Sequence, residues 1–300
     1  MVLQTINYWL AEHPVIVNFR WSPFLPWGAT WWFLISTIAI YVAAATSLHL
    51  LLCLLLNRRH RVPLGPVPAM HSLTLALISI VIFIGIICST VAEIRDTRWL
   101  WRRTKTATAF EWLLCFPLGT RASGRVFFWS YIFYLSRYLH LLRTFFTILR
   151  RRRLTFFTLF NQSVLLLMSF IWLEFSQSFQ VMAILLTTIS YSVIYGYRFW
   201  TAIGLPGACF PFVVDCQVVV LVCNLICHFG VLLLHLFKGG CNGFGAWALN
   251  AVLNSVILFL VLKFYVEVHT RKTEVAELRE REGSTRHWRT SLKTEHEKYR

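Results

Sequence analysis

The sequence predicts an all-α, polytopic membrane protein with seven transmembrane helices that enclose an interior cavity. Of its 300 residues, 57% are hydrophobic and 14% are charged, whereas about a quarter of a soluble domain is charged. Seven apolar stretches are long enough to cross a bilayer, which needs roughly 20 residues for each span. Four of these stretches also carry one polar stripe each, and polar stripes inside a membrane normally face a protein interior or a water-filled cavity.

The seven stretches cover residues 31–56, 73–92, 126–149, 156–173, 181–199, 212–237 and 246–268. Each must be a helix, because backbone groups that face lipid can be satisfied only within the segment. A glycine-rich turn separates the sixth from the seventh. We therefore expect three parts: a lumenal N-terminal segment at 1–30, the transmembrane domain at 31–268, and a charged cytosolic tail at 269–300.

Basic residues near the span ends predict the orientation. They follow spans one, three, five and seven: Arg58, Arg59, Arg61; Arg150 to Arg153; Arg198; and Lys263, Arg271, Lys272. All four groups fall on one side of the membrane, which the positive-inside rule assigns to the cytosol. The basic loop at 93–125 opposes this assignment, but it is longer and is given less weight. The N-terminus is then lumenal, and the first span serves as the signal anchor because no cleavable signal peptide is evident.

The polar stripes locate a candidate site. In the sixth span the stripe is Gln217, Asn224, His228 and His235, and in the third it is Ser136, Arg137, His140, Arg143, Thr144 and Thr147. Single Ser and Thr residues are explained by hydrogen bonding between helices. Two arginines near an imidazole are not, because guanidinium groups stay charged and this stretch offers no carboxylate. They need water, a cytosolic exit or an anionic ligand.

The eight cysteines show no C-x-x-C or Cys/His zinc spacing, so no metal site is expected. On the expected topology, Cys115 and Cys241 are the cysteines of lumenal loops, whereas Cys209 lies on the reducing cytosolic side. An oxidising lumen favours pairing. We therefore predict a disulfide between Cys115 and Cys241.

The region 131–163 resembles the ELO family of membrane fatty-acid elongases, most closely its plant branch. The family block K-x-x-E-x-x-D-T corresponds to Arg137 through Thr144, and the histidine box H-x-x-H-H corresponds to Thr158, Leu159, Phe160, Asn161 and Gln162. Two further blocks keep Tyr195 and Tyr197, and Gln217. The resemblance extends over roughly residues 112–265, but all three histidines of the box are replaced.

The resemblance implies condensation of a long-chain acyl-CoA with malonyl-CoA to a 3-oxoacyl-CoA in the endoplasmic reticulum membrane, with no bound cofactor. The bilayer, other enzymes of the elongation cycle and a second copy of the chain are the implied partners. The amides of Asn161 and Gln162 can neither attack a thioester nor titrate, so chemistry would fall to His140 or His228. The residues expected to bind substrate are Arg137, Arg143, Tyr191, Tyr195, Tyr197, Gln217 and His235.

A second interpretation stays open. The chain could be a non-catalytic elongase homologue that keeps the cavity and binds acyl-CoA or lipid as a sensor or scaffold. A seven-helix receptor or transporter unrelated to elongases is less favoured, because the order and spacing of the blocks match over much of the chain. Nucleic-acid binding is disfavoured, because hydrocarbon-length segments fill most of the sequence.

Overall fold

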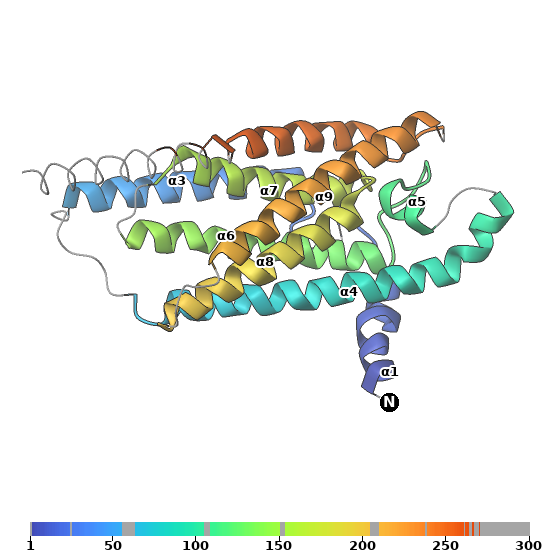
Figure 1. Cartoon of the computed structure of the whole chain (residues 1–300), viewed down its shortest axis with the longest axis horizontal. Helices are drawn as coiled ribbons and strands as arrows, with labels where there is room; N and C mark the ends of the chain where they lie inside the picture. Colours follow the sequence, from blue (N-terminus) through green and yellow to red (C-terminus); the bar gives the residue numbers. More distant parts are fainter. Residues whose placement is uncertain are drawn as a thin grey trace, which may run out of the picture. The chain divides into compact units, whose positions relative to one another are not determined.

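The computed structural model describes residues 2–24, 26–55, 64–104, 109–150, 154–204, 210–237, 239–260, 262–263, 266 and 270. In this part of the chain the regular structure is helical, with an isolated antiparallel bridge between Arg20 and Ser123 (Figure 1). The chain divides into two compact units, Met1–Ala251 and Val252–Arg300. The sites below all belong to the first unit.

The N-terminal segment folds into three short helical pieces. They are α1 (Val2–Asn7), the π-helical η1 (Tyr8–Glu12) and α2 (Pro14–Val17). Pro14 occupies the first position of α2, where the missing N–H is not needed, and Nδ1 of His13 accepts a hydrogen bond from the Val15 N–H at 3.3 Å. The segment is anchored through the Leu10 carbonyl, which accepts hydrogen bonds from Trp129 Nε1 at 2.8 Å and Ser89 Oγ at 3.1 Å.

In the part of the chain that the structure describes, six long helices and one short helix follow. They are α3 (Trp31–Leu55), α4 (Val67–Thr104), α5 (Ala109–Leu114), α6 (Arg125–Leu149), α7 (Phe156–Glu174), α8 (Gln180–Ala202) and α9 (Phe210–Phe237). A further apolar helix covers Phe244–Leu260 and continues across the boundary between the two units. Each of the first six predicted spans coincides, wholly or in its described part, with one of the six long helices, whereas the described part of the seventh coincides with the shorter helix at Phe244–Leu260.

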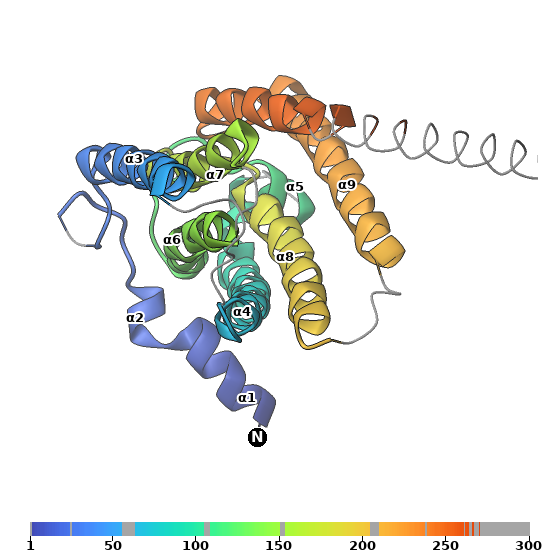
Figure 2. The same cartoon turned by 90° about the vertical axis from the view of Figure 1, so that its left-hand side faces the viewer.

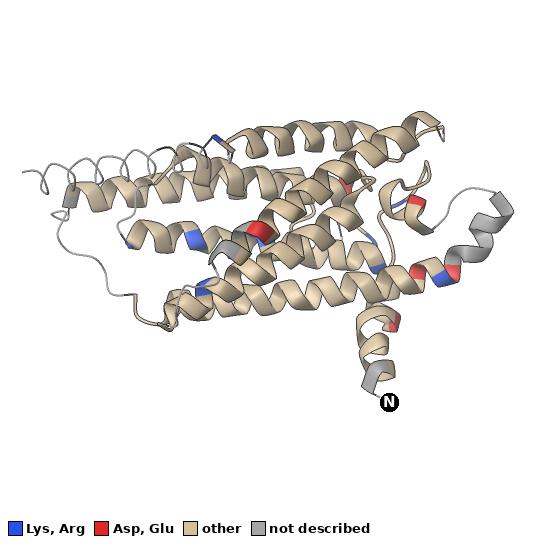
Figure 3. Ribbon diagram, viewed as in Figure 1, with Lys and Arg blue, Asp and Glu red and all other residues tan. Residues whose placement is uncertain are grey.

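Among the described residues, five helices are long and apolar enough to cross a membrane: those at Trp31–Leu54, Val67–Asp96, Phe156–Glu174, Gln180–Ala202 and Asp215–Phe237. Helix α6 has 25 residues but is less apolar than these five. It carries the arginine, histidine and serine residues of the predicted polar stripe, and these lower its hydropathy. Figure 3 shows that charged residues are sparse along the helices and gather toward their ends.

Helix α6 lies inside the first unit. It packs against α4 and α7 and also contacts α3 and α8 (Figure 2). Helices α4 and α6 approach closely because α4 has a glycine at their crossing: a Cβ atom on Gly85 would lie 2.3 Å from the Trp129 ring. Helix α8 packs along α4 and against α9. This arrangement turns one face of α6 toward α8, the helix that carries Tyr191 and Tyr195.

Several predicted features lie outside the described residues. These are most of the charged tail, Cys209, and the basic residues Arg58, Arg59, Arg61, Arg151, Arg152, Arg153, Arg271 and Lys272.

Candidate functional site

The predicted polar stripe of α6 forms much of the buried face of that helix. Ser136, Arg137, His140 and Thr144 are all less than 5% exposed, while Arg143 is half-buried. Arg137, His140 and Thr144 follow one another at three and four positions, and Ser136 adjoins Arg137, so the helix presents them on one side. The Thr144 hydroxyl is hydrogen-bonded to Tyr41 of α3 at 2.7 Å. At this level the stripe joins α6 to α3.

His140 meets two tyrosines of α8. Its Nδ1 lies 2.8 Å from the hydroxyl of Tyr195, and its ring centroid lies 4.8 Å from that of Tyr191. The two bonded residues are 2% and 1% exposed, respectively. Tyr195 also packs against Leu75 and Ala76 of α4. The imidazole is thus fixed by a buried hydroxyl whose own ring is held by a third helix.

Arg137 lies next to this pair and is 3% exposed. Its guanidinium carbon is 4.2 Å from the centroid of the Phe133 ring and 4.6 Å from that of Tyr191. One guanidinium nitrogen contacts Ser136 Oγ at 3.4 Å, whereas Nε and Nη1 have no hydrogen-bond partner among the described residues. No described carboxylate forms an ion pair with it. Two aromatic faces offset part of the cost of burying this charge, but the guanidinium keeps unused donor capacity.

His228 and His235 of α9 occupy a different part of the protein. The His228 ring lies 4.3 Å from that of Phe179, at the start of α8. Phe179 and Tyr195 are about 24 Å apart along the axis of α8, at ~1.5 Å per residue. The two histidines expected to be catalytic, His140 and His228, therefore contact residues that lie far apart along α8, and their contacts do not assemble one site.

His235 supports a turn. Its Nδ1 accepts a hydrogen bond from the backbone N–H of Cys241 at 2.9 Å, and its ring stacks on Phe244 at 3.6 Å. Of the other expected residues, Tyr197 and Gln217 are half-buried, on α8 and α9. The periodicity of the α9 stripe predicted that Gln217, His228 and His235 lie on one side of the helix. It did not predict which residues they contact.

The positions of the histidine box lie at the start of α7. The Thr155 hydroxyl caps this helix by accepting a hydrogen bond from the Thr158 N–H at 3.4 Å, and the two hydroxyl groups are 2.7 Å apart. Asn161 and Gln162 are half-buried in the following turn. Thr158 thus contributes to the helix start through its bonds to the Thr155 cap.

Cys115 and Cys241 form a disulfide in the structure, with their Cα atoms 5.1 Å apart. Beside it, Ser178 Oγ donates a hydrogen bond to the Asn242 carbonyl at 2.8 Å and accepts one from the Phe116 N–H at 2.9 Å. Asn242 was missed in the sequence, although its side chain bonds to Gly119, Thr120, Phe175 and Ser176. Asn242 follows a cysteine in a glycine-rich turn, and this position was the sequence feature that could have indicated its structural role.

In the described part of the chain, no three His, Cys, Asp or Glu side chains come together as a metal site. The cluster that remains is Arg137, His140, Tyr191 and Tyr195: a cation with spare donors next to a hydrogen-bonded imidazole and phenol. Such a set can bind an anionic or carbonyl oxygen and transfer a proton.

Comparison with known proteins identifies the class. Residues 26–277 match the family model described as ELO: GNS1/SUR4 family, so the chain belongs to the ELO family of fatty-acid elongases. It is 60% identical over 270 residues to Fatty acid elongase 3-like of Arabidopsis thaliana, covering 90% of this chain and 93% of that protein. It is 26% identical over 213 residues to Fatty acid elongase A of Dictyostelium discoideum, covering 68% and 72% of the two chains. No solved structure matches the chain.

Proposed function

We propose that this protein is a very-long-chain 3-oxoacyl-CoA synthase of the endoplasmic reticulum membrane. The observation that carries the proposal is the buried Arg137, His140 and Tyr195 cluster at the contact of α6 with α8, in a chain of the elongase family. Its substrates would be a long-chain acyl-CoA and malonyl-CoA, and its products a 3-oxoacyl-CoA two carbons longer, carbon dioxide and coenzyme A.

The chemistry requires a stabilised negative charge and one proton. Decarboxylation breaks the bond to the malonyl carboxyl carbon and leaves an enolate, whose carbon attacks the carbonyl carbon of the acyl thioester. The carbon–sulfur bond then breaks, and the departing thiolate takes up a proton. We assign stabilisation of the enolate oxygen to Arg137, which has unused donors. We assign the proton to His140, which Tyr195 holds in place.

The residues at the two ends of α6 support the proposed orientation of the chain in the membrane. Phe116, which follows Cys115, has its ring 5.8 Å from that of Phe127 at the start of α6, whereas Arg150 caps the other end. Helix α6 has 25 residues, or about 37 Å at ~1.5 Å per residue, enough to cross the bilayer. A disulfide on the oxidising side and a basic loop on the cytosolic side agree with seven spans, a lumenal N-terminus and a cytosolic C-terminus.

The positions of two arginines on α6 indicate how long the proposed substrate site is. Arg150 lies about 20 Å along α6 from Arg137, at ~1.5 Å per residue. An acyl-CoA could place its phosphates near the basic end and its thioester near His140. Arg143, Tyr191, Tyr197 and Gln217 are the further residues that we propose to line a cavity enclosed by the seven helices. His235 is assigned instead to the turn that it supports.

A non-catalytic function is the second candidate. The observation that favours it is the histidine box, because Thr158 is bonded to the Thr155 cap of α7 and the amides of Asn161 and Gln162 cannot titrate. Such a homologue would bind acyl-CoA or lipid and act as a sensor or scaffold among the enzymes of the elongation cycle.

One experiment separates the two candidates. The purified full-length protein is placed in nanodiscs with a long-chain acyl-CoA and radiolabelled malonyl-CoA, and both acyl-CoA binding and labelled 3-oxoacyl product are measured. Product that is absent with a His140→Ala variant but present with a matched His49→Ala variant supports the synthase. Binding without product supports the non-catalytic homologue, and absence of both rejects the two proposals.

A further inference from the structure

A pocket of about 340 Å³ lies where the N-terminal segment meets the start of α6 and the part of α4 that carries Glu93. Its volume is at the lower end of the range for small-ligand sites. It is remote from the buried cluster of α6, because its wall includes Arg125, the first residue of that helix. The residues that line it are Val17, Asn18, Phe19, Arg20, Glu93, Ser123, Gly124 and Arg125.

Backbone hydrogen bonds build one wall of this pocket. The Gly124 N–H donates to the Phe19 carbonyl at 2.8 Å, and the Trp21 N–H donates to the Ala122 carbonyl at 2.9 Å. Arg20 therefore stands in a short antiparallel pairing between two distant segments. Gly124 adopts a φ of 89°, which favours glycine at this turn into α6. The lining side chains are thus held on a defined frame.

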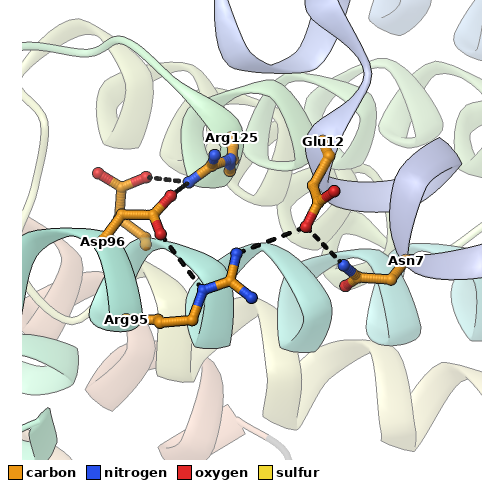
Figure 4. Close-up of polar contacts among 6 residues, drawn as sticks. Asn7, Glu12, Arg95, Asp96 and Arg125 are labelled. Carbon is orange, nitrogen blue, oxygen red and sulfur yellow. Dashed lines mark hydrogen bonds and ion pairs between the residues drawn. The ribbon is translucent and has the colours of Figure 1, made fainter. Parts of the chain in front are cut away.

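The pocket has a basic part and an acidic part. Arg125 Nη1 lies 2.6 Å from Asp96 Oδ2 (Figure 4). The same nitrogen lies 3.8 Å from Glu93 Oε2. The Nε of Arg125 has no hydrogen-bond partner among the described residues. Arg20 is exposed, and in the described part of the chain its guanidinium forms no ion pair. The pocket lining therefore holds the guanidinium of Arg20, the partly hydrogen-bonded guanidinium of Arg125 and the carboxylate of Glu93.

An ion-pair network among the described residues adjoins the pocket. Arg95 lies 3.3 Å from Asp96 and 3.4 Å from Glu12 (Figure 4). Together with the pocket residues, the set holds three arginines and three acids: Arg20, Arg95, Arg125, Glu12, Glu93 and Asp96. A zwitterion offers an opposite charge to both the arginines and the carboxylate that line the pocket, whereas an anion offers one only to the arginines.

The pocket also lies at the level expected for lipid headgroups. The apolar range of α4 ends at Asp96, three residues beyond Glu93. The N-terminal segment carries strongly exposed aromatic residues, Trp9 at 59%, Phe24 at 94% and Trp27 at 60%. Exposed tryptophans near the ends of spans are typical of the membrane–water interface.

We infer that this pocket binds the headgroup of a zwitterionic phospholipid. The phosphate contacts Arg20 and the accessible part of Arg125, because guanidinium groups bind phosphate well. The amine contacts Glu93, and the acyl chains lie along the apolar surface of the bundle. This lipid site is separate from the proposed condensation site and does not depend on it.

The test is lipid retention by the purified full-length protein, measured by native mass spectrometry after exchange into detergent. Phosphatidylethanolamine is titrated against phosphatidylglycerol for the unaltered protein and for Arg20→Ser, Glu93→Gln and the control Arg121→Ser. Arg121 is exposed on the same loop but does not line the pocket. We expect phosphatidylethanolamine to bind at least about tenfold more tightly than phosphatidylglycerol, and Arg20→Ser to remove most of that affinity while Arg121→Ser does not.

Three results would overturn the inference. Equal losses of lipid affinity in Arg20→Ser and Arg121→Ser would show that the lipid responds to the general surface charge and not to the pocket. Equal retention of the two lipids, unchanged in Glu93→Gln, would remove the role of the carboxylate. Soluble glycerophosphoethanolamine that competes at the same concentration as the lipid would assign the pocket to a free metabolite. The melting temperature of each variant shows whether it is folded.

Discussion

His140 of α6 and Tyr195 of α8 are joined by a buried hydrogen bond of 2.8 Å. This pair fixes the position of α6 along α8, because a shift that breaks the hydrogen bond leaves a buried polar group without a partner and costs free energy. Tyr191, one turn earlier in α8, contacts both the imidazole and the guanidinium of Arg137. Helix α8 therefore positions both of the groups that we assign to the condensation reaction.

Replacing Tyr195 by Phe tests this positioning. The ring keeps its packing, but His140 loses its partner, so we expect a stability loss of about 1–3 kcal/mol. The turnover of acyl-CoA should fall by at least about tenfold with a smaller change in KM, because the transition state needs the oriented imidazole more than binding does. Tyr131→Phe is the control, since it removes one hydroxyl bond to the Trp27 carbonyl far from His140. Equal turnover in the two variants would contradict the role.

The two histidines expected to be catalytic should behave differently. His140→Ala should remove condensation by about a hundredfold or more, within the range for a general acid or base. His228→Ala removes ring contacts with Phe179 and Trp247, so we expect it to lower the melting temperature and to leave turnover per folded molecule within a few-fold. Labelled malonyl incorporation, normalised to folded protein, measures both. Activity that survives His140→Ala would indicate that a partner subunit supplies the proton.

The positions of the helices were predictable from the sequence because hydrocarbon-length apolar runs leave the backbone no alternative to a helix. Helix α6 was also found, although its hydropathy is lower, since its polar residues recur on one face. The pairing of Cys115 with Cys241, present in the structure, followed from the side of the membrane expected for each loop. These inferences need only composition, periodicity and the order of the spans.

The partners of the polar residues could not be predicted in the same way. Periodicity places His228 and His235 on one face of α9, but the Phe179 and Cys241 contacts depend on the level at which other segments pass. The aromatic faces on Arg137 come from residue 133 in the same helix and residue 191 in another. Phe133 precedes Arg137 by four positions and so shares its side of α6, but the second aromatic face, Tyr191, depends on how α8 packs against α6.

Replacing Arg137 by Met should separate binding from folding. A buried cation without a described counter-ion costs free energy, so an apolar side chain of similar length should leave the melting temperature unchanged or raise it. Affinity for acyl-CoA should nevertheless fall by at least about tenfold, or ~1.4 kcal/mol. Arg143→Glu, in the half-buried part of the stripe, should also weaken binding, whereas the exposed loop variant Arg121→Met should not. Unchanged affinity in both site variants would remove arginine from the proposed substrate site.

The disulfide should stabilise the folded state mainly through the chain that it closes. Cys115 and Cys241 are 126 positions apart, and a loop of this order corresponds to about 4–5 kcal/mol in the chain-entropy model. Cys115→Ser, Cys241→Ser and the double variant should therefore lower the melting temperature to a similar degree, because each removes the same bond. A reducing agent should destabilise only the unaltered protein, and Cys53→Ser serves as the control because Cys53 is a free, exposed thiol. Additive losses in the double variant, or no response to the reductant, would show that the two side chains act through packing rather than through their bond.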